Sequence, residues 1–325
     1  MLLVKHPADR RTLLWTFVFT PGLLVAHYLR PDLQWWLFPA SMYFAVSCAV
    51  IAHNHMHRPT LKTKGLNRFF SHWISIFYGY PVFAWTPTHN LNHHRYLNKH
   101  GDATITWRFT NKHNALVAST YFFVSAYYQG FWIKDFIRQA KEKNPALYRR
   151  IITQYVVTYG AHLVLAGVAI GLFGVAAGLK SYALAAGIPA FFALWTVMLF
   201  NYTQHVHTDP WSETNHSRNF TGKLLNFMLF GNGYHTVHHN KANLHWADAA
   251  EAHARIQDQI DPRLCHRSMW WFFFQQHVLA LFIPSLGTVQ VGRAPFDCPE
   301  EERRADAPEL VDVSPGGEAT AGGQI

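Results

Sequence analysis

The chain has 325 residues, of which 50% are hydrophobic and only 14% are charged, with 22 histidines and a formal net charge of +9. Water-soluble domains normally carry about 25% charged residues, so the composition argues against a free globular protein and favours a membrane protein. The net charge does not indicate a nucleic-acid partner, because most basic residues lie between apolar segments while residues 297–318 hold eight acidic side chains.

Four stretches without Asp, Glu, Lys or Arg are close to the length of about 20 residues that crosses a bilayer. They cover residues 12–29, 33–52, 151–178 and 181–200. The links within each pair are short, residues 30–32 in the first and the chain around Lys180 in the second, whereas Lys and Arg are concentrated between the pairs. Two helical hairpins, with both termini and all other segments on the cytoplasmic side, satisfy this charge distribution.

Three further apolar stretches are expected to lie at the membrane interface. Residues 66–85 place apolar side chains at i, i+3, i+4, i+7 and i+8, which predicts an amphipathic helix. Residues 115–133 are aromatic and by themselves fit either an interfacial or a crossing helix. Residues 268–283 are aromatic but interrupted by Gln275, Gln276 and His277, which favours the interface.

Histidines gather in clusters at the ends of these stretches or between them. The clusters are His53 and His57; His89, His93 and His94; Asn201 and His205; and His235, His238 and His239. Spacings of three and four residues place side chains on one helical face, and consecutive histidines lie on neighbouring faces. Nine imidazoles packed together without a metal would lose water and, if protonated, repel one another. The pattern therefore predicts a metal centre.

The position of the clusters along the chain constrains the topology. For all nine histidines to lie on one side of the membrane, residues 66–85 must not cross it. An even number of crossings must also separate Arg95 from Asn201, and the third and fourth stretches already supply two. Residues 115–133 should therefore lie in or on the membrane without crossing it.

The type of ligand limits which metal ions the site could bind. Imidazoles suit Zn, Cu, Fe or Ni, and without convergent thiolates an iron–sulfur or structural zinc site is not expected. Nine nitrogens fit two ions of four or five ligands each. No glutamate stands beside the clusters as it does in HExxH zinc hydrolases, so a redox-active pair is favoured.

The sequence resembles the membrane fatty-acid desaturases, including bacterial members. The resemblance rests on HNHMH at 53–57, THNLNHHRYLNKHGD at 88–102, NYTQH at 201–205 and NGYHTVHH at 232–239, and covers roughly residues 33–246. It implies a cytosolic di-iron centre on a four-span scaffold. The nine histidines would be the iron ligands, and Asn201 would lie near one iron through a water. Asp102, Asp209 and Asp248 are candidates for orienting the ligand imidazoles.

The resemblance further implies that two iron ions reduce O2 to an oxidant that abstracts hydrogen from a fatty-acyl chain or similar lipid. Loss of a second hydrogen gives an alkene, whereas return of oxygen gives an alcohol, so a lipid hydroxylase is the main alternative. The chain has no CxxC pair and no GxGxxG. Electrons should therefore come from an external ferredoxin, rubredoxin or cytochrome, and the substrate from the bilayer or an acyl carrier.

Two other classes of function compete. A histidine-rich metal transporter should carry ionisable ligands inside its spans, and the four stretches have no carboxylate. A b-type haem carrier would place histidine pairs inside facing spans rather than at their ends. The expected architecture is an all-α integral membrane protein, with a single desaturase-like domain over residues 1–292, a cytosolic histidine-rich cap and a disordered acidic tail over residues 293–325.

Overall fold

The computed structural model describes residues 3–298 and residue 313. Its secondary structure is almost entirely helical, which confirms the predicted all-α fold. Four helical segments are long and apolar enough to cross a membrane, and they correspond to the four predicted spans: Asp9–Leu29, Pro31–His57, Pro145–Phe173 and Val175–His205. Within the described residues, no other helix meets that requirement, including those over the three stretches predicted to be interfacial.

The chain comprises two compact units. The first unit contains Met1–Pro87, Lys134–Val197 and Val311–Ile325, and the second contains Thr88–Ile133 and Met198–Leu310. The first unit holds the first hairpin, the third span and most of the fourth, and the second unit holds most of the histidine clusters. That residues 1–292 act as a single desaturase-like domain stays a prediction.

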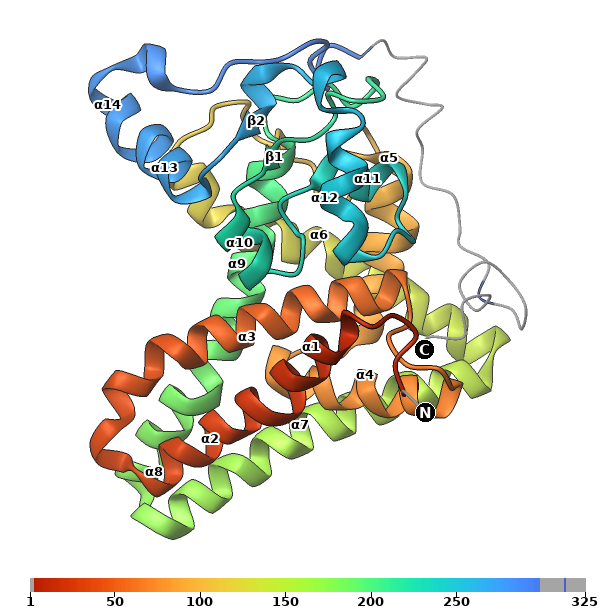
Figure 1. Cartoon of the computed structure of the whole chain (residues 1–325). Helices are drawn as coiled ribbons and strands as arrows, with labels where there is room; N and C mark the ends of the chain where they lie inside the picture. Colours follow the sequence, from red (N-terminus) through yellow and green to blue (C-terminus); the bar gives the residue numbers. More distant parts are fainter. Residues whose placement is uncertain (1–2, 299–312, 314–325) are drawn as a thin grey trace. The chain divides into compact units, whose positions relative to one another are not determined.

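The first hairpin is formed by α2 and α3 of the first unit (Figure 1). Its elements are α1 (Asp9–Leu14), a π-helical turn (Trp15–Phe19), α2 (Thr20–Leu29), a 3-10 turn (Pro31–Leu33) and α3 (Gln34–His57). Pro21 has no N–H to continue the helical ladder, and the hydroxyl of Thr20 donates to the Trp15 carbonyl at 2.7 Å where the π-helical turn ends. The first span therefore remains helical through Pro21, because the helix widens locally into a π-helical turn and does not break.

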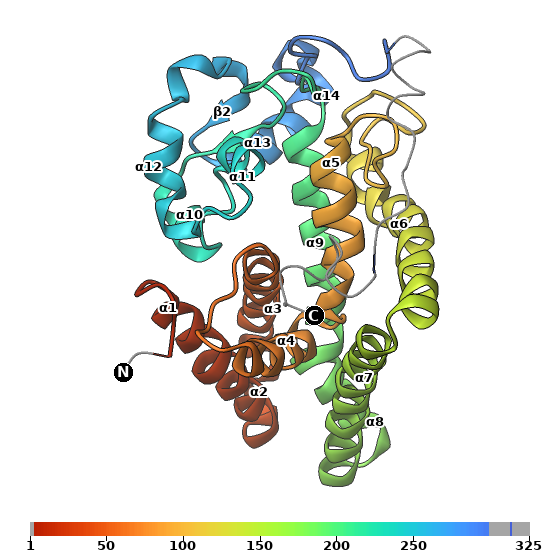
Figure 2. The same ribbon diagram turned by 90° about the vertical axis from the view of Figure 1, so that its right-hand side faces the viewer.

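The second hairpin turns at Gly174, not near Lys180 as predicted. It consists of α7 (Pro145–Phe173), α8 (Val175–Tyr182), a π-helical turn (Ala183–Gly187) and α9 (Ile188–His205). Gly174 has a φ of 76°, which glycine adopts without the steric cost other residues incur. A Cβ on Gly178 would lie 2.5 Å from the Cα of Ile170, so a glycine there lets α8 pack closely on α7 (Figure 2). Lys180 is consequently part of α8.

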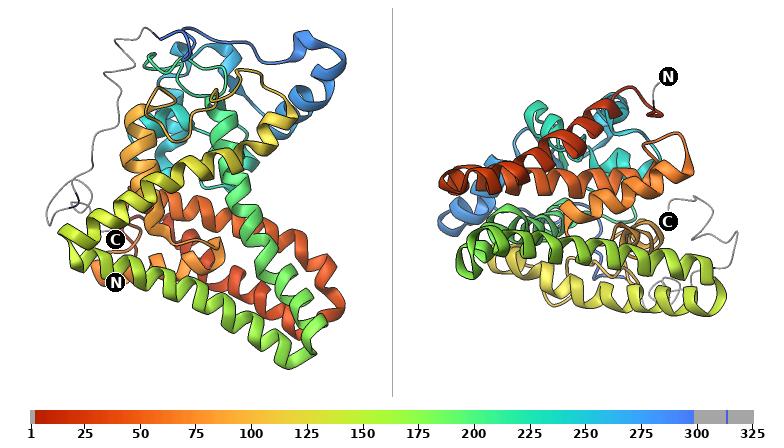
Figure 3. Two further views of the ribbon diagram at one scale, coloured as in Figure 1. Left: turned by 180° about the vertical axis from the view of Figure 1, so that it is seen from behind. Right: turned by 90° about the horizontal axis from the view of Figure 1, so that it is seen from below.

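The predicted interfacial helix over residues 66–85 is shorter and more deeply packed than expected. α4 covers Lys64–Tyr78 and ends at Gly79, whose φ is 82°. Ser71 and Ser75 fall outside the apolar positions of the predicted helix, yet both are fully buried, because α4 packs against both α3 and α7 (Figure 3). A short 3-10 turn (Val82–Ala84) follows in place of the predicted last turn of the helix.

The helix over residues 115–133 is longer than predicted. α6 covers Ala115–Lys143 and therefore continues for ten residues beyond Ile133. No helix-breaking residue occurs before Pro145, where Asn144 accepts a hydrogen bond from the Leu147 N–H and caps the next helix.

The remaining elements of the second unit are short. They are a π-helical segment (Thr86–His93, which begins in the first unit), α5 (His94–Tyr96), α10 (Lys223–Met228), α11 (His235–Asn240), α12 (Ala249–Ala254), α13 (Met269–Phe274), a π-helical turn (Gln275–Leu279), α14 (Ala280–Phe282) and four 3-10 turns (Trp246–Asp248, Gln257–Gln259, Pro262–Leu264 and Pro284–Leu286). Strands β1 (Asn219–Phe220) and β2 (Cys265–His266) pair in parallel (Figure 1). Sequence reasoning did not predict this pairing. Residues 269–282 expose Trp270, Trp271 and Phe282, as an interfacial segment should.

The beginning of the predicted disordered tail is ordered. The N–H of Arg293 donates to the Asp209 carboxylate at 2.9 Å, and the guanidinium carbon of Arg293 lies 4.0 Å from the centre of the Trp211 ring. Cys298 is buried. These contacts were not evident from composition. Apart from residue 313, whose carbonyl accepts a hydrogen bond from Asn144, the rest of the tail lies outside the described residues.

Candidate metal centre

Four histidines of the second unit converge on one point. His93 ends the π-helical segment, His205 is the last residue of α9, and His235 and His239 lie one turn apart on α11. The Nε2 atom of His205 lies 3.1 Å from that of His93 and 2.9 Å from that of His235, and the Nε2 atoms of His235 and His239 are 3.1 Å apart. We call these residues the four-histidine group.

The protons of two of these rings are fixed by their neighbours. The Nδ1 of His205 lies 3.1 Å from the His216 carbonyl, which can only accept, so Nδ1 carries the proton. The Nδ1 of His93 lies 2.8 Å from the Asp102 carboxylate, which is acceptor-only when ionised. Each ring therefore presents its Nε2 to the other, at 3.1 Å. Two imidazole nitrogens this close are held together by a shared proton or by a metal ion that both bind.

The nitrogen separations fit a metal ion. Two imidazole nitrogens bound at about 2.1 Å to one ion, at angles between about 90° and 110°, lie about 3.0 to 3.4 Å apart. Two of the three Nε2 separations, 3.1 Å each, fall in this range, and the third, 2.9 Å, lies just below it. The donor set is all imidazole and partly enclosed, which suits a transition metal.

A second group of histidines adjoins the first within the second unit. The Nε2 of His94 lies 3.1 Å from the Nε2 atoms of both His89 and His238. The ring of His94 also lies 4.4 Å, centre to centre, from the ring of His239 in the four-histidine group. We call His89, His94 and His238 the three-histidine group. Its position beside the first group is the arrangement that two neighbouring ions require.

His53 and His57 lie at the end of α3 in the first unit. Their ring centres are 4.9 Å apart, as expected for residues one helical turn apart, and His53 stacks on Trp85 at 5.1 Å. Their assignment to the three-histidine group, which would complete a five-ligand set, stays a prediction. His55, between them in sequence, instead faces Thr60 and Ser71 at 3.0 and 3.2 Å.

Asn201 contacts a polar network of the second unit. Its side-chain N–H donates to the Tyr121 hydroxyl at 3.0 Å, and that hydroxyl donates to the Thr104 carbonyl. The Thr104 hydroxyl in turn lies 2.7 Å from Asp102 and 2.9 Å from the Nδ1 of His93. Asn201 is therefore linked to His93 of the four-histidine group through Tyr121 and Thr104.

The sequence model of the fatty acid desaturase family matches residues 10–274. The chain belongs to the fatty acid desaturase family. This confirms the family inferred from the histidine motifs. No curated protein and no solved structure matches the chain. Membership of the family makes the chain an oxidoreductase of the desaturase and oxygenase type, and implies a lipid substrate and association with a membrane.

Of the three carboxylates considered as orienting groups in this desaturase-family chain, only Asp102 contacts a clustered histidine. Asp209 accepts hydrogen bonds from the backbone N–H groups of Trp211 and Arg293 and holds a loop, and Asp248 is half-buried. Thr104, Tyr121 and His216 were missed from the sequence. Thr104 is the last residue of the GDAT sequence at 101–104, two residues after Asp102, and this spacing is the signal that could have identified it. A backbone carbonyl such as that of His216 leaves no sequence signal.

Electrostatics favour an ionised Asp102 and a neutral His239 in this family member. Burial raises the pKa of Asp102, but the neighbouring His93 and hydrogen bonds from His93 and Thr104 outweigh it and hold the pKa below its ordinary value. Burial is the main cause that lowers the pKa of His239 well below its ordinary value, and the adjacent imidazoles lower it further. Neutral imidazole is the form that binds a metal.

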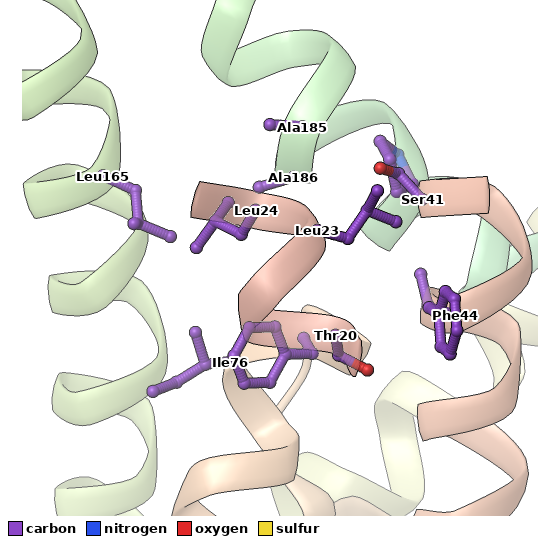
Figure 4. Close-up of a pocket in the computed structure, with 12 residues that line it drawn as sticks. Thr20, Leu23, Leu24, Ser41, Phe44, Ile76, Leu165, Ala185 and Ala186 are labelled. Carbon is purple, nitrogen blue, oxygen red and sulfur yellow. The ribbon is translucent and has the colours of Figure 1, made fainter. Parts of the chain in front are cut away.

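An apolar pocket lies within the first unit of the chain (Figure 4). Leu23 and Leu24 from α2, Phe44 from α3, Ile76 from α4 and Leu165 from α7 contribute to its wall. Two hydroxyls, of Thr20 and Ser41, also line it; that of Ser41 lies 2.8 Å from the Nε2 of His27. His162 of α7 lies within hydrogen-bonding distance of the Tyr182 hydroxyl and the Ile76 carbonyl.

Proposed function

We propose that this desaturase-family chain is an O2-dependent enzyme with two irons that desaturates a fatty-acyl chain or a similar lipid. The irons are held by His53, His57, His89, His93, His94, His205, His235, His238 and His239. The observation that carries the proposal is the convergence of the Nε2 atoms of the four-histidine group, with those of His93 and His205 3.1 Å apart. A metal ion bound by these nitrogens would account for their convergence.

The residues around the centre have separate roles. Asp102 and the His216 carbonyl hold the Nδ1 protons of His93 and His205, which keeps both Nε2 lone pairs directed at the metal. Burial of His93, His205 and His235, each at most 4% exposed, keeps bulk water away from that group. When bound, the two irons supply the O2-dependent oxidation of an unactivated C–H bond.

The reaction consumes two electrons, and the sequence contains no CxxC pair and no GxGxxG. We assign their delivery to an external one-electron carrier of the ferredoxin, rubredoxin or cytochrome type. The concentration of Lys and Arg between the two hairpins supports a cytoplasmic position for the histidines and both termini. Reporter fusions at both termini test that topology, because a reporter active only in the cytoplasm should work at each end.

Product analysis tests the proposed reaction. The protein is purified with its metals, supplied with reductant, O2 and candidate lipids, and the products are analysed by mass spectrometry. An alkene that disappears in His235→Ala but persists in His277→Gln, a histidine outside both groups, supports the desaturase. Recovery of hydroxylated lipid alone would show a hydroxylase of the same family. Metal-dependent ion flux in proteoliposomes without O2 consumption would show a transporter.

A further inference from the structure

A fully buried arginine caps the helix that carries His205. Arg218 is 1% exposed, and one of its guanidinium nitrogens, Nη1, donates to the carbonyls of Thr203 at 2.7 Å and Val206 at 3.0 Å. Its backbone N–H donates to the Gln204 carbonyl at 2.7 Å. Within the described residues its acceptors are carbonyl oxygens, not carboxylates. Burial lowers the pKa of Arg218 to about 10, so the group is still charged at neutral pH.

A buried charge without a carboxylate partner is costly, so its position requires an explanation. The last carbonyls of a helix lack helical partners and carry the negative end of the helix dipole. Arg218 satisfies two such groups of α9, the carbonyls of Thr203 and Gln204, and also the carbonyl of Val206, the residue after the helix. The His205 carbonyl accepts from Asn98 at 3.0 Å and Thr208 at 2.8 Å. These hydrogen bonds fix the last turn of α9, which ends at His205 of the four-histidine group.

The residues beside Arg218 connect this turn to α11. The preceding His216 carbonyl accepts the Nδ1 proton of His205, and the following Asn219 side chain accepts from the Thr236 N–H at 3.0 Å and donates to the Thr236 hydroxyl at 2.8 Å. Thr236 directly follows His235. One short segment, residues 216–219, therefore contacts the helices that carry three of the four histidines.

We propose that Arg218 is a positioning residue of the four-histidine group, which fixes the last turn of α9 so that His205 meets His93, His235 and His239. This inference rests on the proposed function, because it concerns the same metal centre. A lysine is not an equivalent replacement, because its ammonium group is more strongly hydrated than a guanidinium and is therefore more costly to bury.

The test compares Arg218→Met with Arg263→Met, an exposed arginine of the same unit whose guanidinium bonds to Asp261. Metal content is measured on the purified proteins. The control should keep about two irons per chain. The iron content of the Arg218→Met protein should fall toward one per chain. Its affinity for metal at the four-histidine group should drop about tenfold, which is the lower end of the effect of residues that orient metal ligands.

Spectroscopy separates positioning from general stability. In the Co(II)-substituted protein, Arg218→Met should alter the visible ligand-field bands, whereas a variant that is only less stable would keep them until it unfolds. Arg218→Lys keeps the charge and should give an intermediate spectrum; it is also the substitute if Arg218→Met does not fold. Adding Arg218→Met to His205→Ala should cause no further loss of metal, because the residue acts through His205.

Wild-type metal content and an unchanged Co(II) spectrum in folded Arg218→Met would overturn the proposal. So would a further, additive loss of metal in the double variant. If the wild-type protein itself holds no transition metal, the proposed function fails. If it holds two irons and Arg218→Met leaves them unchanged, only the role of Arg218 fails.

Discussion

The Asp102 carboxylate lies 2.8 Å from the Nδ1 of His93 and is itself fixed by the backbone N–H of Asn98 at 2.7 Å and by both donors of Thr104. This arrangement sets the tautomer of His93. Asp102→Asn keeps the shape of the side chain but can present an N–H to the ring, which would favour the wrong tautomer. Metal affinity should fall about 10- to 100-fold. Chelator titration of the purified protein measures it.

The matched control for Asp102 is Asp258→Asn, which removes the charge of an exposed carboxylate in the same unit. It should leave metal affinity unchanged. Equal losses in the two variants would show that net charge, rather than the orientation of His93, governs metal retention.

Tyr121→Phe should destabilise the second unit. The phenol hydroxyl accepts from Asn201 and donates to the Thr104 carbonyl, and its loss leaves buried polar groups without a partner. The expected cost is about 1 to 3 kcal/mol in the free energy of unfolding. Tyr127→Phe, at an exposed position of the same helix, should change stability little. Thermal unfolding in detergent compares them, and equal melting temperatures would contradict the role of the hydroxyl.

Gly178→Ala should loosen the second hairpin, because the added Cβ would meet the backbone of Ile170 and Ala169. We expect about 1 to 3 kcal/mol of destabilisation. Gly171→Ala is the control, since nothing lies within 4 Å of its Cβ position, and it should be neutral or slightly stabilising. Unfolding measured by circular dichroism distinguishes the two. A hairpin that turned at Lys180 would not show this difference.

The second unit should lose stability in mild acid. Burial, and secondarily the charge of Arg218, lower the pKa of His266 from its ordinary 6.5 to about 4. Between these values the unfolded chain binds a proton that the folded chain does not. The stability of the neutral form is therefore complete above about pH 6.5 and declines as the pH falls toward 4. In His266→Gln, the melting temperature should fall less between pH 7 and pH 5 than in the wild type. An unchanged slope would count against this explanation.

Sequence patterns predicted the spans and the histidine clusters because both depend on local periodicity. Helix ends were less accurate, since they depend on backbone conformation and packing that composition does not encode. Gly174 forms the turn because it adopts a positive φ, and Gly178 allows close packing of α8 on Ile170 of α7. The buried side of α4 was misassigned because serines pack well between helices although they read as polar. Arg218 acts by donating to the backbone carbonyls of other residues, and His216 acts through its own backbone carbonyl, so neither role leaves a sequence motif.

Iron K-edge X-ray absorption of the purified protein, combined with its iron content, tests the central claim most directly. The account predicts two irons per chain, with a first shell of nitrogen and oxygen atoms at about 2.1 Å and the multiple-scattering features of imidazole. His205→Ala should weaken those features and release iron. Protein that is folded yet free of iron, or iron bound by sulfur, would contradict the account.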